Sequence, residues 1–107
     1  MPGQLESAMQ RSVNRWAGQH RIRYYKVDVR YYSFWPDVHY IGFGGDLWLE
    51  FKRPGEVLTP GQARMHKELV LRNQRVYTVS SREQSIFLLK SILDAPRVSE
   101  DRNQVFT

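Results

Sequence analysis

The chain opens with apolar residues that recur at helical intervals. Four of them are spaced three or four residues apart, with polar residues between: Leu5, Met9, Val13 and Trp16. Side chains at this spacing fall on one face of an α-helix. The pattern predicts an amphipathic helix over residues 4–17, with Gly18 as the glycine that often follows a helix.

The next part of the chain has patterns typical of strands. Arg21 to Tyr32 is rich in Tyr and Val and lacks Gly and Pro, which predicts one long strand. Pro36 interrupts this pattern, and Val38 to Ile41 is predicted to form a second strand. A cluster of turn residues follows, made of Gly42, Gly44, Gly45 and Asp46.

A third strand, Leu47 to Lys52, is expected to pair with the second as a hairpin. Its apolar and polar positions alternate, with Leu47, Leu49 and Phe51 set against Trp48, Glu50 and Lys52. Successive side chains of a strand point to opposite faces of a sheet. Glu50 and Lys52 are therefore expected to share one face, while the apolar set packs on the other.

Turn and cap signals divide the C-terminal half. Residues 53–56 indicate a turn, and Thr59 to Gln62 is typical of a helix start, with Thr at the cap, Pro at the first helical position and Gln at the third. This helix is predicted to run to about Arg72. Arg75 to Ser80 alternates again and predicts a fourth strand.

A last helix is predicted after the fourth strand. Ser80 or Ser81 should cap it, Pro96 should end it, and its apolar residues include Ile86, Leu89 and Leu93. The whole order is helix, three strands, helix, strand, helix, which predicts an α/β fold. At 107 residues the chain fits one domain, 1–107, with a core over about 4–93 and a polar tail over 97–107 that is disordered or used in assembly.

Composition limits the possible sites and locations. The chain has no Cys, so disulfides and thiolate metal sites are excluded, and any metal must be held by oxygen or imidazole, which suits Mg²⁺ or Mn²⁺. No stretch approaches the ~20 apolar residues needed to span a bilayer, and residues 1–10 carry no signal-peptide core. We therefore expect no membrane partner and a cytoplasmic location, in a bacterium or a phage-infected host cell.

The charge balance is basic. Lys and Arg total 16 against 11 Asp and Glu, giving a net charge of +5. Most of the basic residues are Arg, whose planar guanidinium matches phosphate oxygens in two contacts at once. The charge favours a polyanionic partner such as nucleic acid, but on charge alone a merely soluble basic protein is an equal alternative.

The strongest candidates for a catalytic or metal-binding role are Asp37, Glu50 and Lys52. Across a hairpin, the spacing from Asp37 to Glu50 can return the first carboxylate beside the second, which makes a divalent-cation site of the hard-oxygen type. Lys52 faces the same way as Glu50, so its ammonium can position a water or stabilise charge on a phosphate. Glu-x-Lys alone on a strand is more often a solvated face with cross-strand ion pairing.

These residues, taken together, resemble the PD-(D/E)xK nuclease superfamily and, within it, the VRR-NUC family, including small stand-alone members found in phages. The resemblance rests on Pro36-Asp37, Glu50-Phe51-Lys52 and Gln62. It is extended by Glu6, Gln10 and Trp16 in the first helix, Lys26 in the first strand, residues 52–55 and 58–62, and the strand from Val76 to Val79. It covers about residues 4–93 and implies a restriction-endonuclease-like core with a mixed central sheet flanked by helices.

The resemblance implies a role for each matching residue. Asp37 and Glu50 would bind the metal, helped by the carbonyl of Phe51, and Lys52 would orient or activate the attacking water. Gln62 would lie at the edge of the site, although it could equally close a capping box. Glu6 would act on a metal-bound water or a second ion, although the helix dipole alone favours an acid near a helix start.

Several other positions are candidates for substrate contact. Phosphate contacts are expected from Lys26, Arg30, Arg53, Arg64, Lys67 and Arg72, although each alone is more often a solvated charge. His39 and His66 are left out of the site, because a lone His is more often a hydrogen-bonded residue than a ligand. Bulky Phe34 and Trp35 stand where the family usually has small residues. The aromatic residues from Tyr24 to Trp35 could stack on bases, bury a dimer interface or pack in the core.

The function expected from this resemblance is structure-specific DNA cleavage by an endonuclease that uses Mg²⁺ or Mn²⁺. Branched DNA such as a Holliday junction is the leading substrate, because a two-fold homodimer supplies two equivalent sites for two symmetric cuts. The alternatives are a nickase or flap nuclease on other branched or single-stranded DNA, and a non-catalytic DNA-binding module.

Overall fold

The fold follows the predicted order of helices and strands. The computed structural model describes residues 2–94, with side chains from Glu6 onward. Its elements are α1 (Pro2–Gln19), β1 (Arg23–Lys26), β2 (Val38–Gly42), β3 (Gly45–Phe51), α2 (Pro60–Leu71), β4 (Val76–Val79) and α3 (Arg82–Lys90). The expected tail over 97–107 and the helix-ending Pro96 lie outside the described residues.

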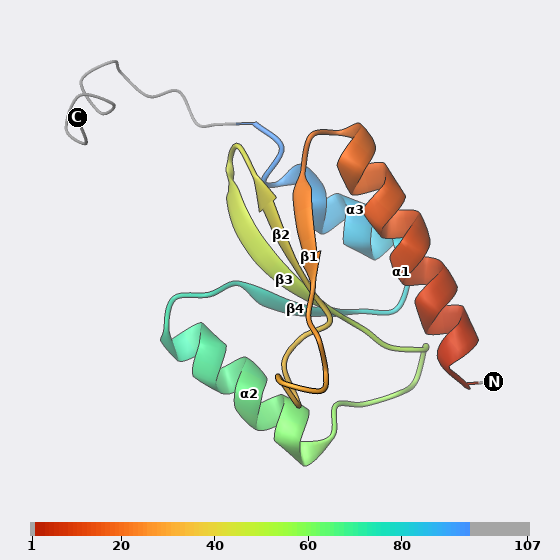
Figure 1. Ribbon diagram of the computed structural model, residues 1–107, viewed down its shortest axis with the longest axis vertical. Helices are drawn as coiled ribbons and strands as arrows, with labels where there is room; N and C mark the ends of the chain where they lie inside the picture. Colours follow the sequence, from red (N-terminus) through yellow and green to blue (C-terminus); the bar gives the residue numbers. More distant parts are fainter. Residues whose placement is uncertain (1, 95–107) are drawn as a thin grey trace.

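The sheet is mixed, as expected. Its four strands lie in the order β1-β2-β3-β4, with antiparallel pairing from β1 to β3 and parallel pairing between β3 and β4. Parallel neighbours need a crossover connection, and α2 supplies it. Figure 1 shows α1 and α3 together on one side of the sheet and α2 beside β4 on the other side. No described helix is long and apolar enough to cross a membrane.

The core lies between the sheet and the pair α1 and α3. The apolar face of β3 is fully buried there, as the alternation predicted, together with residues from both helices and the neighbouring strands. The buried set is Val13, Ala17, Ile22, Val38, Tyr40, Leu47, Leu49, Phe51, Val79, Leu89 and Ile92. The hydroxyl of Tyr40 donates to Asn14 Oδ1 at 2.5 Å, so the polar end of this ring is satisfied inside the core.

The long strand expected from Arg21 to Tyr32 is wrong. β1 ends at Lys26, and a turn built around Asp28 follows. The Asp28 carboxylate accepts hydrogen bonds from the backbone and side chain of Arg30, and its carbonyl accepts from the N–H groups of Tyr31 and Tyr32. Asp side chains compete with ladder hydrogen bonds in this way, so the Tyr- and Val-rich sequence forms an exposed loop.

Two helix ends also differ from expectation. Gly18 lies inside α1, which ends at Gln19, and the left-handed residue that follows the helix is instead Arg21, with φ of 61°. The N–H of Ile22 then donates to the carbonyl of Ala17, as in a Schellman motif. α3 begins after the expected cap Ser81 but ends at Lys90, so Leu93 lies beyond the helix.

Gly42 is a position where the fold requires the absence of a side chain. A Cβ added there would lie 2.0 Å from the carbonyl oxygen of Ile92, a backbone atom that cannot rotate away. We expect Gly42→Ala to lower the free energy of unfolding by ~1–3 kcal/mol, as overpacking in a tight interior does. Urea denaturation of the purified protein measures this change.

Gly18 offers the matched control within the same chain. Its added Cβ would meet only Tyr24 Cε1 at 3.8 Å, which is ordinary van der Waals contact. Because Gly costs a helix interior roughly 0.5–1 kcal/mol relative to Ala, Gly18→Ala should stabilise the protein. Equal effects of the two substitutions would contradict the packing described for Gly42.

Candidate active site

The hairpin register brings Asp37 and Glu50 together. Val38 pairs with Leu49 in the β2–β3 ladder, so one more step places Asp37 opposite Glu50. The backbone N–H of Phe51 donates to Asp37 Oδ2 at 2.7 Å and holds this carboxyl at the end of β3. The two carboxyl groups are close enough that the charge of Glu50 raises the pKa of Asp37.

This carboxyl pair is held mainly out of water. Glu50 is 2% exposed, although it lies on the polar face of β3. Burial and the neighbouring charge of Glu50 raise the pKa of Asp37 to about 7, against the opposing effects of the Phe51 N–H and of Lys52. A cation bound between these two acids would reduce the electrostatic repulsion between their carboxylates.

Lys52 lies where it can act on this pair. Its own N–H donates to the carbonyl of Val79 at 2.9 Å, which fixes its backbone just past the end of β3. Its ammonium lowers the pKa of Asp37 on one side and of Glu6 on the other. The structure therefore brings Asp37, Glu50 and Lys52 to one end of the sheet.

Glu6 reaches the same end of the sheet from α1. Partial burial raises its pKa, as do a hydrogen bond to Glu56 and the charge of that residue, while Lys52 and Arg53 lower it. Glu6, Lys52 and Arg53 line an open pocket of about 410 Å³ together with residues 80–82. Glu6 thus lies beside Lys52, but its carboxyl partner is Glu56, and its expected action on a second ion stays a prediction.

Gln62 forms the capping box that was one of its two expected roles. Its N–H donates to Thr59 Oγ1 at 3.2 Å, and its side-chain Oε1 accepts from the N–H of Thr59 at 3.0 Å. The amide oxygen is engaged in the cap, which leaves the amide nitrogen as the group that could face a substrate. An active-site role for Gln62 stays a prediction.

His66 is a site residue that the sequence analysis missed. It lies on α2, is 9% exposed, and its Nε2 is 3.2 Å from Glu50 Oε1. His66 and Glu50 are sixteen residues apart in the sequence, so no local sequence pattern predicts their contact. The available signal was the spacing from Gln62, since residues four apart share a helix face and His66 therefore lies on the same face as Gln62.

The donor set suits a hard divalent cation in part. Asp37 and Glu50 supply carboxylate oxygens, the ligand type that Mg²⁺ and Mn²⁺ prefer. Within residues 6–94, no group of three or more His, Asp or Glu side chains could hold a metal ion. Any further ligands would therefore be the expected carbonyl of Phe51, water or substrate oxygens.

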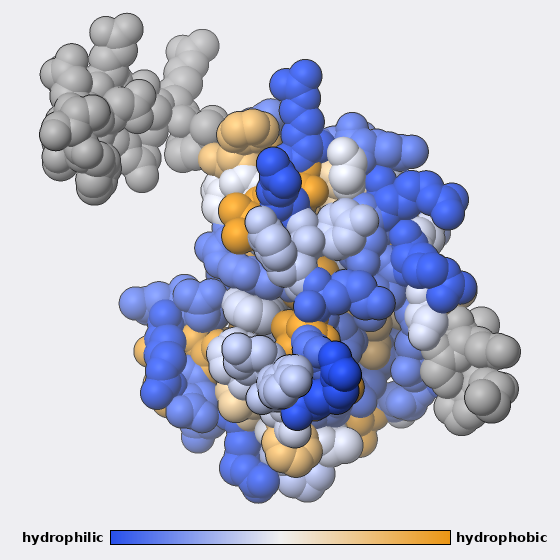
Figure 2. Space-filling model, in the orientation of Figure 1, coloured by the Kyte–Doolittle hydropathy of each residue, from blue (hydrophilic) through white to orange (hydrophobic). Residues whose placement is uncertain are grey.

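Of the six expected DNA-contacting cations, three are exposed and three lie beside acids. Lys26 on β1 and the α2 residues Arg64 and Lys67 are exposed. Three others lie beside acids: Arg30 with Asp28 at 2.7 Å, Arg53 with Glu56 at 3.9 Å and Arg72 with Glu68 at 3.1 Å. The face shown in Figure 2 is mostly hydrophilic, with apolar side chains in small separate patches.

Comparison with known proteins adds independent support for the fold. No family model matches the sequence, and no curated protein matches it. Among solved structures, a chain described as a VRR_NUC domain has a TM-score of 0.71 and 23% identity, covering 80% of this chain and 95% of its own. A VRR_NUC domain protein has a TM-score of 0.70 and 15% identity, covering 89% and 94%.

At these identities the likeness establishes the fold, and the expected resemblance is confirmed at that level. The chain has the fold of a VRR-NUC domain, with the element order and mixed sheet predicted from its sequence.

The raised pKa of Asp37 predicts how stability depends on pH. In the metal-free protein, the unfolded carboxyl ionises near pH 4 while the folded one keeps its proton to about 7, so stability falls as pH rises between those values. Asp37→Asn removes this loss and keeps an acceptor for the Phe51 N–H. We expect it to raise the free energy of unfolding near neutral pH by roughly 2 kcal/mol.

Urea unfolding in EDTA, repeated across the weakly acid to neutral range, measures this effect. Asp28→Asn is the control, because Arg30 lowers the pKa of that exposed carboxyl and its loss should not stabilise the protein. A gain for Asp37→Asn that is the same at every pH would rule out the titration as its cause.

The contact between His66 and Glu50 predicts a positioning role for the imidazole. We expect His66→Ala to weaken Mn²⁺ binding by about 10–100-fold, because groups that orient a metal-binding carboxylate have effects of this size. His66→Gln should recover much of the affinity, since its amide can still donate to Glu50. Isothermal titration with Mn²⁺ measures both, and His39→Ala, which loses a contact to Asp46 instead, serves as the control. Equal affinity in all variants would refute the role.

Proposed function

We propose that this protein is a nuclease that hydrolyses phosphodiester bonds of DNA with the help of Mg²⁺ or Mn²⁺. The proposal is supported chiefly by one observation: a buried pair of carboxyl groups, Asp37 and Glu50, with the ammonium of Lys52 close by. That arrangement lies on a VRR-NUC fold. The basic charge of the chain suits the polyanionic substrate.

Each residue of the centre has a distinct task. Asp37 and Glu50 hold the cation, and the bonds from Phe51 and His66 keep their oxygens in place before it binds. A bound divalent ion supplies Lewis-acid polarisation of the phosphoryl oxygen and a lowered pKa for water. Lys52 orients the attacking water and offsets the negative charge that grows on the phosphate. Glu6, which lines a pocket together with Lys52, would act on a metal-bound water or on a second ion.

The substrate we propose is branched DNA, with the Holliday junction as the leading case. A four-way junction is resolved by two symmetric cuts, and a homodimer of this small domain would present two equivalent centres. Nicking or flap removal needs one cut only, so an enzyme that acts as a single copy would favour other branched or single-stranded DNA instead. Exposed Lys26, Arg64 and Lys67, with Arg53 next to the centre, are proposed to contact backbone phosphates.

Cleavage assays test this function directly. Labelled junction, flap and linear duplex are incubated with the protein in Mn²⁺, in Mg²⁺ and in EDTA. We expect cutting only with a divalent ion, and a loss of at least about 100-fold in Asp37→Ala, Glu50→Ala and Lys52→Ala. Lys52→Ala should still bind Mn²⁺, because the lysine is no ligand.

Two control variants separate catalysis from general charge effects. Asp94→Ala removes an exposed acid beside Gly44, at the far end of the sheet from the centre, and Lys90→Ala removes a cation from α3. Both should cut at the wild-type rate. Cutting that survives the loss of either Asp37 or Glu50 would refute the assignment, and DNA binding without cutting in any metal would favour a non-catalytic binding module.

A further inference from the structure

A row of aromatic rings crosses the sheet next to the carboxyl pair. Tyr25 pairs with His39, and His39 pairs with Trp48, so the three side chains share one face across β1, β2 and β3. Asp37 and Glu50 form the next row on that face, since each is two residues along its strand. Two residues advance a strand by about 7 Å, so the aromatic row lies directly beside the candidate centre.

The loop before β2 extends this row into a groove. Trp35 lies 5.4 Å from Trp48 between ring centroids, and Tyr32 lies 5.6 Å from Trp35 in an edge-on arrangement. The open groove has a volume of about 450 Å³, and it is lined by residues 25–28 with Tyr32, Trp35, His39 and Trp48. Tyr25 is 56% exposed and Tyr32 51%, so ring surface is available at its edges.

The groove is held in shape before any ligand arrives. Phe34 adopts a left-handed backbone with φ of 71°, which is costly for a bulky residue. Its ring occupies the space above Gly61, where an added Cβ would lie 2.5 Å from Phe34 Cδ1. Trp35 itself borders a pocket together with Met65 and Leu69 of α2. The packing of Phe34 over Gly61 holds the loop at the start of α2, and Trp35, the next residue, lines the groove.

His39 and Trp48 are fixed as well. The two rings stack with centroids 4.1 Å apart and planes 10° apart, and His39 Nε2 is 2.7 Å from Asp46 Oδ2. Flat rings that are already ordered lose little conformational freedom when another flat ring stacks on them. The groove is therefore suited to a planar partner.

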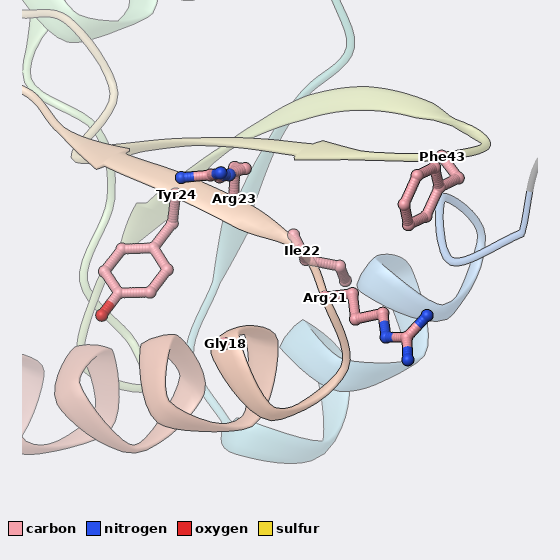
Figure 3. Close-up of a pocket in the computed structure, with 6 residues that line it drawn as sticks. All are labelled: Gly18, Arg21, Ile22, Arg23, Tyr24 and Phe43. Carbon is pink, nitrogen blue, oxygen red and sulfur yellow. The ribbon is translucent and has the colours of Figure 1, made fainter.

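The surroundings of the groove favour a nucleotide as that partner. Arg23 lies one row beyond Tyr25 on the same face, paired with Ile41, and it is exposed. Figure 3 shows Arg23 and Tyr24 on opposite sides of β1, with Tyr24 directed towards α1. A cation on one side of the aromatic row and the carboxyl centre on the other match a strand whose phosphates flank a stacked base.

We propose that this groove binds an unpaired base of the DNA strand, adjacent to the phosphate that is cut at Asp37 and Glu50. The inference rests on the proposed nuclease function and names its substrate class. A base inside a duplex is stacked between its neighbours and cannot enter the groove. The protein therefore selects DNA in which a base next to the scissile phosphate is unpaired or opens at a branch point, as at the centre of a junction.

Equilibrium binding to short single strands tests the groove without cleavage. The probes are a fluorescent oligothymidine and the same strand with abasic sites at its central positions, measured by anisotropy in EDTA. The wild-type protein should prefer the intact strand by about 5–100-fold, the usual effect of base stacking on an aromatic side chain. Tyr25→Ala and Trp35→Ala should each reduce this preference severalfold, while leaving affinity for the abasic strand nearly unchanged.

Phe87→Ala is the matched control, because that ring is 77% exposed on α3, away from the groove. It should keep the wild-type preference. Circular dichroism verifies the fold of each variant, and Tyr25→Ala, at an exposed edge position, keeps the test valid if Trp35→Ala is unstable. A second measurement follows tryptophan fluorescence: quenching by the intact strand should persist in Trp16→Phe and fall in Trp48→Phe.

The outcomes separate this inference from the proposed function. If the protein cleaves DNA but shows no preference for the intact over the abasic strand, base binding in the groove is refuted and the nuclease function still stands. If Tyr25→Ala and Trp35→Ala lower the preference for the intact strand but the protein cuts no DNA, base binding in the groove is supported and the nuclease function is refuted. If Tyr25→Ala changes the oligomeric state and not the preference, the groove is covered by a second copy and the proposal is wrong.

Discussion

The pairing register of the β2–β3 hairpin is the constraint on which the site depends. A shift by one residue would turn Glu50 to the core face and Leu49 to the polar face, so burial of Leu47, Leu49 and Phe51 holds the register in place. The glycine-rich turn and the close approach of Ile92 to Gly42 fix the same alignment from the other end. Packing energy from the core is thus what sets two acids opposite each other.

Holding those acids together works against stability. Burial and the charge of Glu50 disfavour the ionised form of Asp37, while the N–H of Phe51 and the ammonium of Lys52 oppose this. A bound cation would make this pair of acids less unfavourable. A local loss of stability of this kind, within a fold that is otherwise consistent with its sequence, is typical of functional sites.

The parts of the fold that could be predicted are those with local causes. The hairpin, the capping box of Thr59 and Gln62, and a serine cap for α3 each depend on a few neighbouring residues. The first two were predicted, and the cap at Ser81 is one of the two serines that were expected. Asp37, Glu50 and Lys52 could be placed together because strand alternation and the turn determine their relation. Their metal-binding and catalytic roles remain predictions.

The features that could not be predicted depend on competition between alternative hydrogen bonds or on contacts between residues far apart in the sequence. Strand propensity from Arg21 to Tyr32 was overruled by the hydrogen bonds that Asp28 makes with Arg30, a competition that propensity alone does not weigh. Gly18 stayed helical because Arg21 took the left-handed position instead. His66 was missed because its contact with Glu50 is made only when α2 packs against the sheet.

The contact between Phe34 and Gly61 has a consequence for how such sequences can diverge. Any side chain at position 61 would occupy the place of the ring, and without the ring little would compensate for the left-handed backbone at position 34. The two positions are therefore expected to change together across related chains. A relative with a larger residue at the helix start should carry a Gly or Asn in the loop, and with it a differently shaped approach to its acidic pair.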